Sequence, residues 1–215
     1  MTIESNEELE ALLGVTEING DLLIEGAVTT LGALDCLRHV RGTLGVKNTE
    51  LSTFEGLQQL VSATTVEVHG NGNLRSFASL GIVEVEGLFW IYDNPSLEEV
   101  QLDLTEYVGG LIIGKCFSGN PAEFSGNDVL TKIRFPGLAG GQIPSISLAG
   151  NPSLTTIDGI LEWSSSIVLL DLLGNTMLDS EAVRTAWIAA GKDADLITTC
   201  GNLGDVNLCI CTGTE

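Results

Sequence analysis

Residues 87–100 read GLFWIYDNPSLEEV and contain the pattern that decides the fold. Phe89 and Ile91 form an apolar-x-apolar pair, which places two side chains on one face of a short strand and the intervening residue on the other. An asparagine follows, and Leu97 and Val100 then supply a second apolar pair. The segment therefore predicts a strand, a turn and a second strand in quick succession.

The same pattern recurs along the chain. The first members of the apolar pairs are spaced 22 to 24 residues apart, with one spacing of 35. One such unit cannot bury its inner face alone, whereas stacked units bury a continuous column of Leu, Ile and Val and pair their strands in parallel. The sequence therefore predicts a mainly β fold, a right-handed parallel β-helix or solenoid of about seven coils. The pairs are Leu22/Ile24, Leu44/Val46, Val66/Val68, Phe89/Ile91, Leu111/Ile113, Ile146/Leu148 and Leu170/Leu172.

Asparagines recur just after the first strand of a unit, where the chain must turn. Asparagine tolerates the left-handed conformation, and its amide can bond to the units on either side. We expect a structural ladder rather than a catalytic role, formed by Asn48, Asn71, Asn94, Asn151 and Asn175.

The whole chain, 1–215, is predicted to be one domain. A capping box at Ser5 starts an N-terminal helix with Leu9, Leu12 and Leu13 on its apolar face, and residues 1–14 form that end. The coils occupy 15–178. The remainder, 179–215, contains a helix with Val183, Ala186, Trp187 and Ala190 on one face and a cysteine-containing tail. The long spacing places an insertion within 115–144, with Phe117, Phe124 and Phe135 as residues that could cover the neighbouring coils.

Composition limits the possible partners. The chain has 215 residues, with 29 acidic and 9 basic side chains and a formal net charge of −20. Such a surface repels phosphate backbones, so nucleic acid is not an expected partner.

No apolar run approaches the length of a membrane span. The first residues contain no signal peptide, and we expect one to have been removed from a secreted or cell-surface protein.

Three of the five cysteines lie close together near the C-terminus. A disulfide from Cys200 to Cys209 or Cys211 would hold the tail and would require an oxidising compartment. The alternative is a zinc site, which lacks a fourth ligand nearby, so no metal and no cofactor are predicted. Cys36 and Cys116 are each expected to be buried small apolar residues.

The opening of the chain resembles a known family. Ile18, Gly20, Leu22 and Ile24 match the pattern I-x-G-x-L-x-I of receptor L domains, the leucine-rich ligand-binding modules of insulin- and epidermal-growth-factor-type receptors. The segments at 93–97 and 150–154 look like that family's N-x-x-L turns, and the closer likeness is to bacterial secreted or surface proteins with L-domain repeats. The resemblance implies a right-handed β-helix, an extracellular setting and a binding role. The upstream cysteine of the receptor pattern is missing.

Alternation along the predicted strands also identifies a candidate ligand surface. If the aligned pairs point inward, the residues between and after them form two outward columns. An exposed aromatic cluster on a rigid sheet is typical of an interaction site. The candidate ligand-binding residues are Trp90, Tyr92, Ile112, His69, Glu67 and Lys47.

Three classes of function follow from these patterns. The first is a non-catalytic extracellular binding module for a protein, peptide or glycan ligand. The second is a structural or self-assembling surface protein, since stacked coils and an odd cysteine support association. The third is a glycan-active enzyme, which would need an acid pair or a basic residue in a groove. The sequence favours the first. It favours the third least, because Lys47 is the one lysine or arginine on the predicted outward columns and Glu25 and Glu67 are two coils apart, about 9 to 10 Å.

Overall fold

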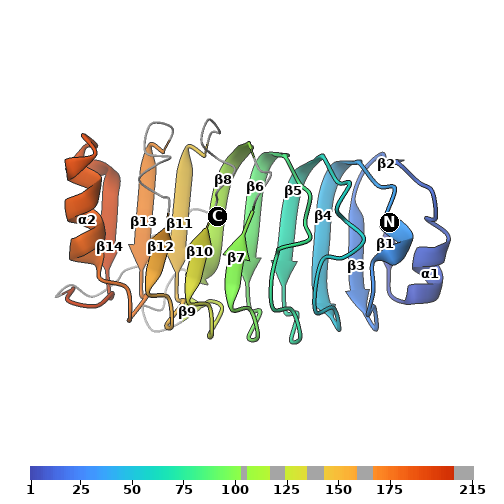
Figure 1. Ribbon diagram of the computed structural model, residues 1–215, viewed down its shortest axis with the longest axis horizontal. Helices are drawn as coiled ribbons and strands as arrows, with labels where there is room; N and C mark the ends of the chain where they lie inside the picture. The colour runs from blue at the N-terminus through green and yellow to red at the C-terminus, as the bar shows by residue number, and fades with distance from the viewer. Residues whose placement is uncertain (103–105, 117–123, 135–142, 159–166, 206–215) are drawn as a thin grey trace.

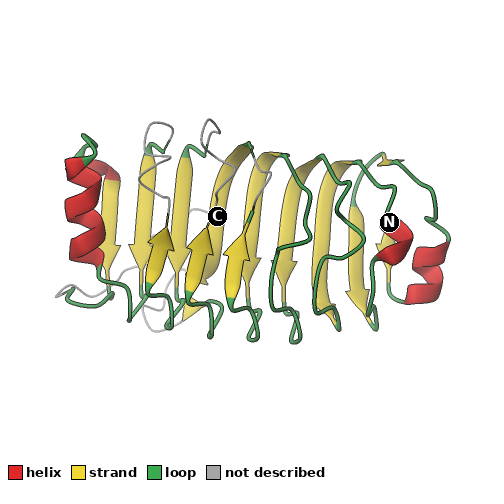
Figure 2. Cartoon of the chain, viewed as in Figure 1, coloured by secondary structure: helices red, strands yellow, loops and turns green. Residues whose placement is uncertain are grey.

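A computed structural model describes residues 1–102, 106–116, 124–134, 143–158 and 167–205. Its strands lie side by side in a long row that the chain follows from one end to the other (Figure 1). Helix α1 (Asn6–Glu10) lies at the N-terminal end of the row and α2 (Ser180–Ala189) at the C-terminal end. The fold is mainly β, as the sequence predicts (Figure 2).

Most strands belong to one large sheet in which neighbouring strands are parallel. Two short strands lie off its main path. β2 (Glu17–Ile18) pairs with β4 (His39–Thr49), and β9 (Phe124–Ser125) pairs antiparallel with β8 (Tyr107–Cys116). The main path runs, in spatial order, through β1 (Thr2–Ile3), β3 (Leu22–Gly26), β4 (His39–Thr49), β5 (Ser62–His69), β6 (Glu84–Tyr92), β8 (Tyr107–Cys116), β11 (Ser145–Ala149), β13 (Leu169–Leu173) and β14 (Ile197–Cys200).

A smaller parallel sheet contains β7 (Glu99–Gln101), β10 (Lys132–Arg134) and β12 (Thr156–Asp158). Short 3₁₀ turns, η1 (Gly32–Leu34) and η3 (Ala194–Leu196), complete the described helices and strands. The apolar pairs of the sequence pattern point inward and form one contiguous buried cluster, as their alternation requires. Within it, the ring centroids of Phe54 and Phe77 lie 4.9 Å apart, and those of Phe77 and Phe89 lie 5.9 Å apart.

A buried column of hydrogen-bonded asparagines joins successive repeats. Each amide oxygen accepts from the backbone and side-chain N–H groups of the preceding asparagine, as Asn94 does for Asn71 at 3.2 and 3.0 Å. The column begins at Thr49 and ends where Asn202 donates to the Asp205 carboxylate. Its members are Asn71, Asn94, Asn127, Asn151, Asn175 and Asn202.

The ladder is thus confirmed, but the prediction was wrong for Asn48 and missed Asn127 and Asn202. Each ladder residue after a main-sheet strand follows a residue with positive φ, such as Gly70 at 69°. Asn48 occupies that left-handed position, with φ of 52°, and Thr49 takes the ladder position. Asparagine is one of the few residues other than glycine that adopt this conformation readily.

The long spacing is not one continuous insertion. Asn127 joins the ladder, Leu130 and Ile133 are buried in the core, and β10 pairs with strands of both neighbouring repeats. The region predicted as an insertion, 115–144, therefore contains a regular part of a repeat. Phe117 and Phe135 lie outside the described residues, as does the side chain of Phe124.

Helix α1 follows its sequence signal in part. The Ser5 hydroxyl accepts from the Glu8 backbone N–H, and the Glu8 carboxylate accepts from the Glu4 N–H at 2.7 Å. Leu9 and Leu12 are buried. The expectation that Leu13 belongs to the buried face is wrong, because the helix ends before it and its side chain is exposed.

Helix α2 begins after Asp179, whose carboxylate accepts from the Ala182 N–H. Trp187 is fully buried and donates from its indole N–H to the Asp193 carbonyl. The tryptophan therefore packs into the core at this end of the molecule. The other three residues predicted on that face are not all buried, since Ala190 is exposed.

Candidate functional site

The parallel register brings the predicted ligand residues together on the outer face of the large sheet. Glu67 of β5 pairs with Trp90 of β6, which pairs with Ile112 of β8. In the next outward column, Lys47 of β4, His69 and Tyr92 are aligned in the same way. The register of both predicted columns is confirmed, because alternation along parallel strands fixes which residues share a face. In the second column the expectation of outward side chains is wrong beyond His69 for Tyr92, Gly114 and Ala149, since these residues are buried.

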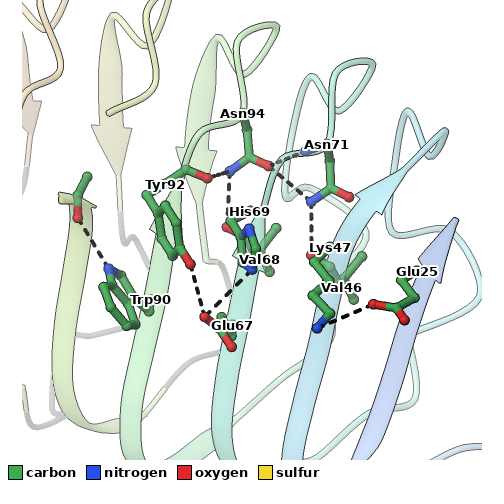
Figure 3. Close-up of polar contacts among 11 residues, drawn as sticks. Glu25, Val46, Lys47, Glu67, Val68, His69, Asn71, Trp90, Tyr92 and Asn94 are labelled. Carbon is green, nitrogen blue, oxygen red and sulfur yellow. Dashed lines mark hydrogen bonds and ion pairs between the residues drawn. The ribbon is translucent and has the colours of Figure 1, made fainter. Parts of the chain in front are cut away.

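Three rings form an aromatic cluster on this face, made of His69, Tyr92 and Trp90 (Figure 3). The His69 and Tyr92 rings are stacked, with centroids 4.5 Å apart and planes 10° apart. The Trp90 and Tyr92 rings are tilted by 43°, with centroids 4.8 Å apart. Contacts of this kind stabilise aromatic pairs beyond the area that they bury.

Hydrogen bonds fix the orientation of the two larger rings. The Tyr92 hydroxyl donates to Glu67 Oε1 at 3.1 Å, and the Trp90 indole N–H donates to the Gly114 carbonyl at 3.3 Å (Figure 3). Each bond crosses to a neighbouring strand, so the rings are held relative to the sheet. The aromatic cluster is therefore a preorganised surface, which reduces the entropy that a ligand must overcome.

Charged groups surround the aromatic cluster. Lys47 Nζ lies 3.3 Å from Glu25 Oε2, and His69 Nε2 lies 3.7 Å from Glu67 Oε1. Lys115 Nζ lies 5.1 Å from the Trp90 ring centroid and 5.2 Å from that of Tyr92, within cation–π range.

The sequence pattern did not predict Lys115 at this face, although Lys47 is the one lysine or arginine on the two outward columns. Strict alternation after Ile113 places Lys115 outside the two outward columns. Gly114, however, has a φ of 92°, which changes the direction of the strand, and the ammonium group then reaches the rings. A glycine immediately before the lysine was the available signal.

Burial differs among the predicted ligand residues. Tyr92 is only 8% exposed, so the expectation that its ring is freely accessible is wrong, whereas Trp90 and Ile112 are half-buried. The neighbouring rings and Lys115 contact Tyr92. A ligand on this face would therefore meet Trp90 and Ile112 first, with Tyr92 as the ring that supports them.

Two pKa values are shifted within the site. Burial lowers the pKa of His69 below the usual histidine value, the Glu67 carboxylate opposes this shift, and Lys47 adds to it. Burial and the charge of Glu67 raise the pKa of the Tyr92 phenol well above its usual value. Tyr92 therefore remains a hydrogen-bond donor across the physiological pH range.

The cysteines divide into two groups. Cys36 is an exposed free thiol, so the expectation that it is buried is wrong, and a hydrogen bond to Asp35 raises the pKa of this thiol. Cys200 lies at the end of β14 and is buried. Cys209, Cys211 and the side chain of Cys116 lie outside the described residues.

The described residues contain no group of three or more His, Cys, Asp or Glu side chains arranged to hold a metal ion. None of the helices in this part of the chain is long and apolar enough to cross a bilayer. No family model, curated protein or solved structure matches the chain.

Proposed function

We propose that this protein is a non-catalytic binding module that acts outside the cell or at its surface and uses the sheet face around Trp90. The observation that supports this most is the fixing of the aromatic cluster by hydrogen bonds from Tyr92 and Trp90 to adjacent strands. Half-buried aromatic side chains on a rigid scaffold are common anchors of recognition sites.

The proposed scaffold is a right-handed parallel β-helix with a helix at each end. The return of the chain to the same sheet at regular intervals, the parallel register and the asparagine ladder support it. Helices α1 and α2 would then cover the ends of the stack, which limits edge-to-edge association. A relationship to receptor L domains is proposed on the segment around Ile18, Gly20, Leu22 and Ile24.

Selection from unbiased ligand sets tests the proposed function. A random peptide phage library and a printed glycan array would be probed with the wild-type protein, Trp90→Ala and Leu13→Ala. Leu13 is 65% exposed and lies near α1, so its variant is a matched surface control. We expect ligands that bind the wild type and Leu13→Ala but not Trp90→Ala. Circular dichroism spectra would show that the variants are folded.

Two outcomes would contradict the proposal. Either neither library yields a ligand, or every selected ligand binds Trp90→Ala as well as it binds the wild type. Trp90→Phe provides a second variant that keeps a ring at the position, and it should retain part of the affinity even if Trp90→Ala is poorly folded.

Self-assembly is the second candidate function, and the exposed Cys36 thiol favours it. A thiol on the surface can join two molecules in an oxidising compartment. Light scattering with and without a reductant tests this candidate. A covalent dimer that dissociates on reduction, and that Cys36→Ser abolishes, would support it.

A further inference from the structure

Part of the outer face of three adjacent strands carries no acidic side chain in a strongly acidic protein. The outward side chains within residues 88–90 of β6, 110–112 of β8 and 145–147 of β11 are uncharged. Glu84 and Glu86 lie exposed earlier on β6, and the Lys115 ammonium group lies over the Trp90 ring. In the column of Trp90, the charged residues nearest to this area are Glu67 on β5 and Asp171 on β13. We call this area the neutral strip, formed by the exposed Leu88, the half-buried Trp90, Ile112, Ser145 and Ser147, and Gly110 between them.

The neutral strip is flat where its middle strand carries glycine. The Leu88 and Ser145 side chains lie on either side of Gly110, each 3.0 Å from the place where a Cβ atom would stand. Strand spacing gives the strip a width of about 10 Å, and the rise along each strand gives it a length of about 7 Å. A surface of this size accommodates a small chain-like ligand lying across the strands.

The chemistry of the neutral strip combines apolar area with hydrogen-bonding groups at its margins. Trp90 and Ile112 supply apolar area, and the Ser147 hydroxyl can donate and accept. At one margin, the Glu67 carboxylate offers further acceptor positions beyond the one used by Tyr92, and Lys115 brings ammonium donors above the rings.

The charges of the protein decide between ligand classes. The net charge of −20 disfavours anionic ligands, and the Lys115 ammonium group over the Trp90 and Tyr92 rings repels a cationic chain at this face. A peptide strand would find no sheet edge here, because the backbone groups of the central strand β8 pair with β6 and β11. A sugar ring, by contrast, has an apolar C–H face surrounded by hydroxyl groups.

We propose that the neutral strip binds an uncharged oligosaccharide, with a sugar ring on Trp90 and further rings over Ile112 and Ser147. This inference rests on the proposed function and specifies its ligand class. The hydroxyl groups of the sugar bond to Glu67 and Lys115 at one margin and to Ser147 on β11. The predicted contacts therefore span three adjacent strands.

Isothermal titration with defined hexasaccharides tests the proposal. The probes are neutral hexamers of glucose, mannose and N-acetylglucosamine, an anionic hexauronate and a cationic glucosamine hexamer. We expect at least one neutral hexamer to bind and neither charged hexamer to match it. Ser147→Lys should weaken that binding by about tenfold or more, since it places a charged side chain on the contact surface.

Thr198→Lys is the matched control for the added charge. Thr198 lies in the same outward column on β14, beyond Asp171, and its side chain is exposed. Its replacement should change the dissociation constant by less than about twofold, because the new charge is about four strand spacings from Trp90. The two variants have the same net charge, so a difference between their affinities reports the effect of where the added charge lies.

The outcomes separate this inference from the proposed function. The ligand class is wrong if no neutral hexamer binds, or if a charged hexamer binds more tightly in a Trp90-dependent manner. The location is wrong if a neutral hexamer binds and Ser147→Lys and Trp90→Ala leave its affinity unchanged. If only selected peptides bind in a Trp90-dependent manner, the proposed function stands and the oligosaccharide proposal fails.

Discussion

Asn94 donates a hydrogen bond from Nδ2 to Oδ1 of Asn127 at 3.1 Å, although 33 residues separate them in the sequence. Only 23 residues separate Asn71 from Asn94, and the bond between those two has nearly the same length, 3.0 Å. The extra residues thus leave the ladder unchanged. The large sheet keeps its register through the longest repeat, and the outward face next to Trp90 depends on that register.

Replacement of Asn127 by alanine should destabilise the fold. The variant loses an acceptor for two N–H groups of Asn94 and a donor to the Ile91 carbonyl, all of them buried. We expect a loss of about 3 kcal/mol or more in the free energy of unfolding, measured by urea denaturation. Asn48→Gly is the control and should be nearly neutral, because Asn48 lies outside the ladder at a position with positive φ.

Removal of the Tyr92 hydroxyl should weaken the site without removing its ring. Tyr92→Phe loses the bond to Glu67 Oε1, and we expect a decrease of about 1 to 2 kcal/mol in the free energy of unfolding. The control is Tyr107→Phe, at the half-buried tyrosine of β8. This variant should change the free energy of unfolding by less than about 0.5 kcal/mol. Equal effects of the two variants would show that the Tyr92–Glu67 bond does not contribute to stability.

Acidification should destabilise the protein through His69. Because burial lowers the pKa of His69 in the folded state, the unfolded chain binds its proton at a higher pH than the folded chain does. The contribution of His69 to the free energy of unfolding therefore decreases as pH falls below about 6.5, the usual histidine pKa. It becomes constant once pH is below the pKa of His69 in the folded state.

The measurement is the free energy of unfolding between pH 5 and pH 8, about the range in which histidine titrates. Four charged groups contribute to the field at the imidazole, Glu67 and Asp93 favouring protonation and Lys47 and Lys115 opposing it. The variant His69→Gln should show a weaker dependence of the free energy of unfolding on pH. A proton NMR titration that places the His69 pKa above the usual value would refute this explanation.

The C-terminal tail should be held by a disulfide. We expect peptide mapping without reduction to find Cys200 bonded to Cys209 or Cys211. Cys200→Ser should lower the free energy of unfolding by about 2 to 3 kcal/mol, because the bond closes a short loop. Cys36→Ser should have little effect, since that thiol is free and exposed. Alkylation of Cys200 in the unreduced native protein would rule out the bond.

The repeat pattern predicted the sheet well because it has a simple physical origin. Alternation along a strand fixes the two faces, so the columns through Glu67, Trp90 and Ile112 could be read from the apolar pairs. The ladder residues Asn71 and Asn94 were identified because their spacing matches one repeat. These features repeat, and each copy supports the interpretation of the others.

The errors lie where one residue changes the local geometry. Repeat spacing aligns Asn48 with the other asparagines, but positive φ there gives the ladder position to Thr49. Asn127 was missed because the long spacing hides its place in the repeat. Lys115 was missed because Gly114 changes the strand direction, and the burial of Tyr92 depends on neighbours from three strands.

Chemical-shift mapping would test the central claim most directly. A ¹⁵N-labelled sample would be titrated with the neutral hexasaccharide that binds most tightly. We expect the largest amide shifts to cluster on β6, β8 and β11, around Trp90, Ile112 and Ser147. Shifts centred on the smaller sheet of β7, β10 and β12, with the amide of Trp90 unaffected, would contradict the claim that this face is the binding site.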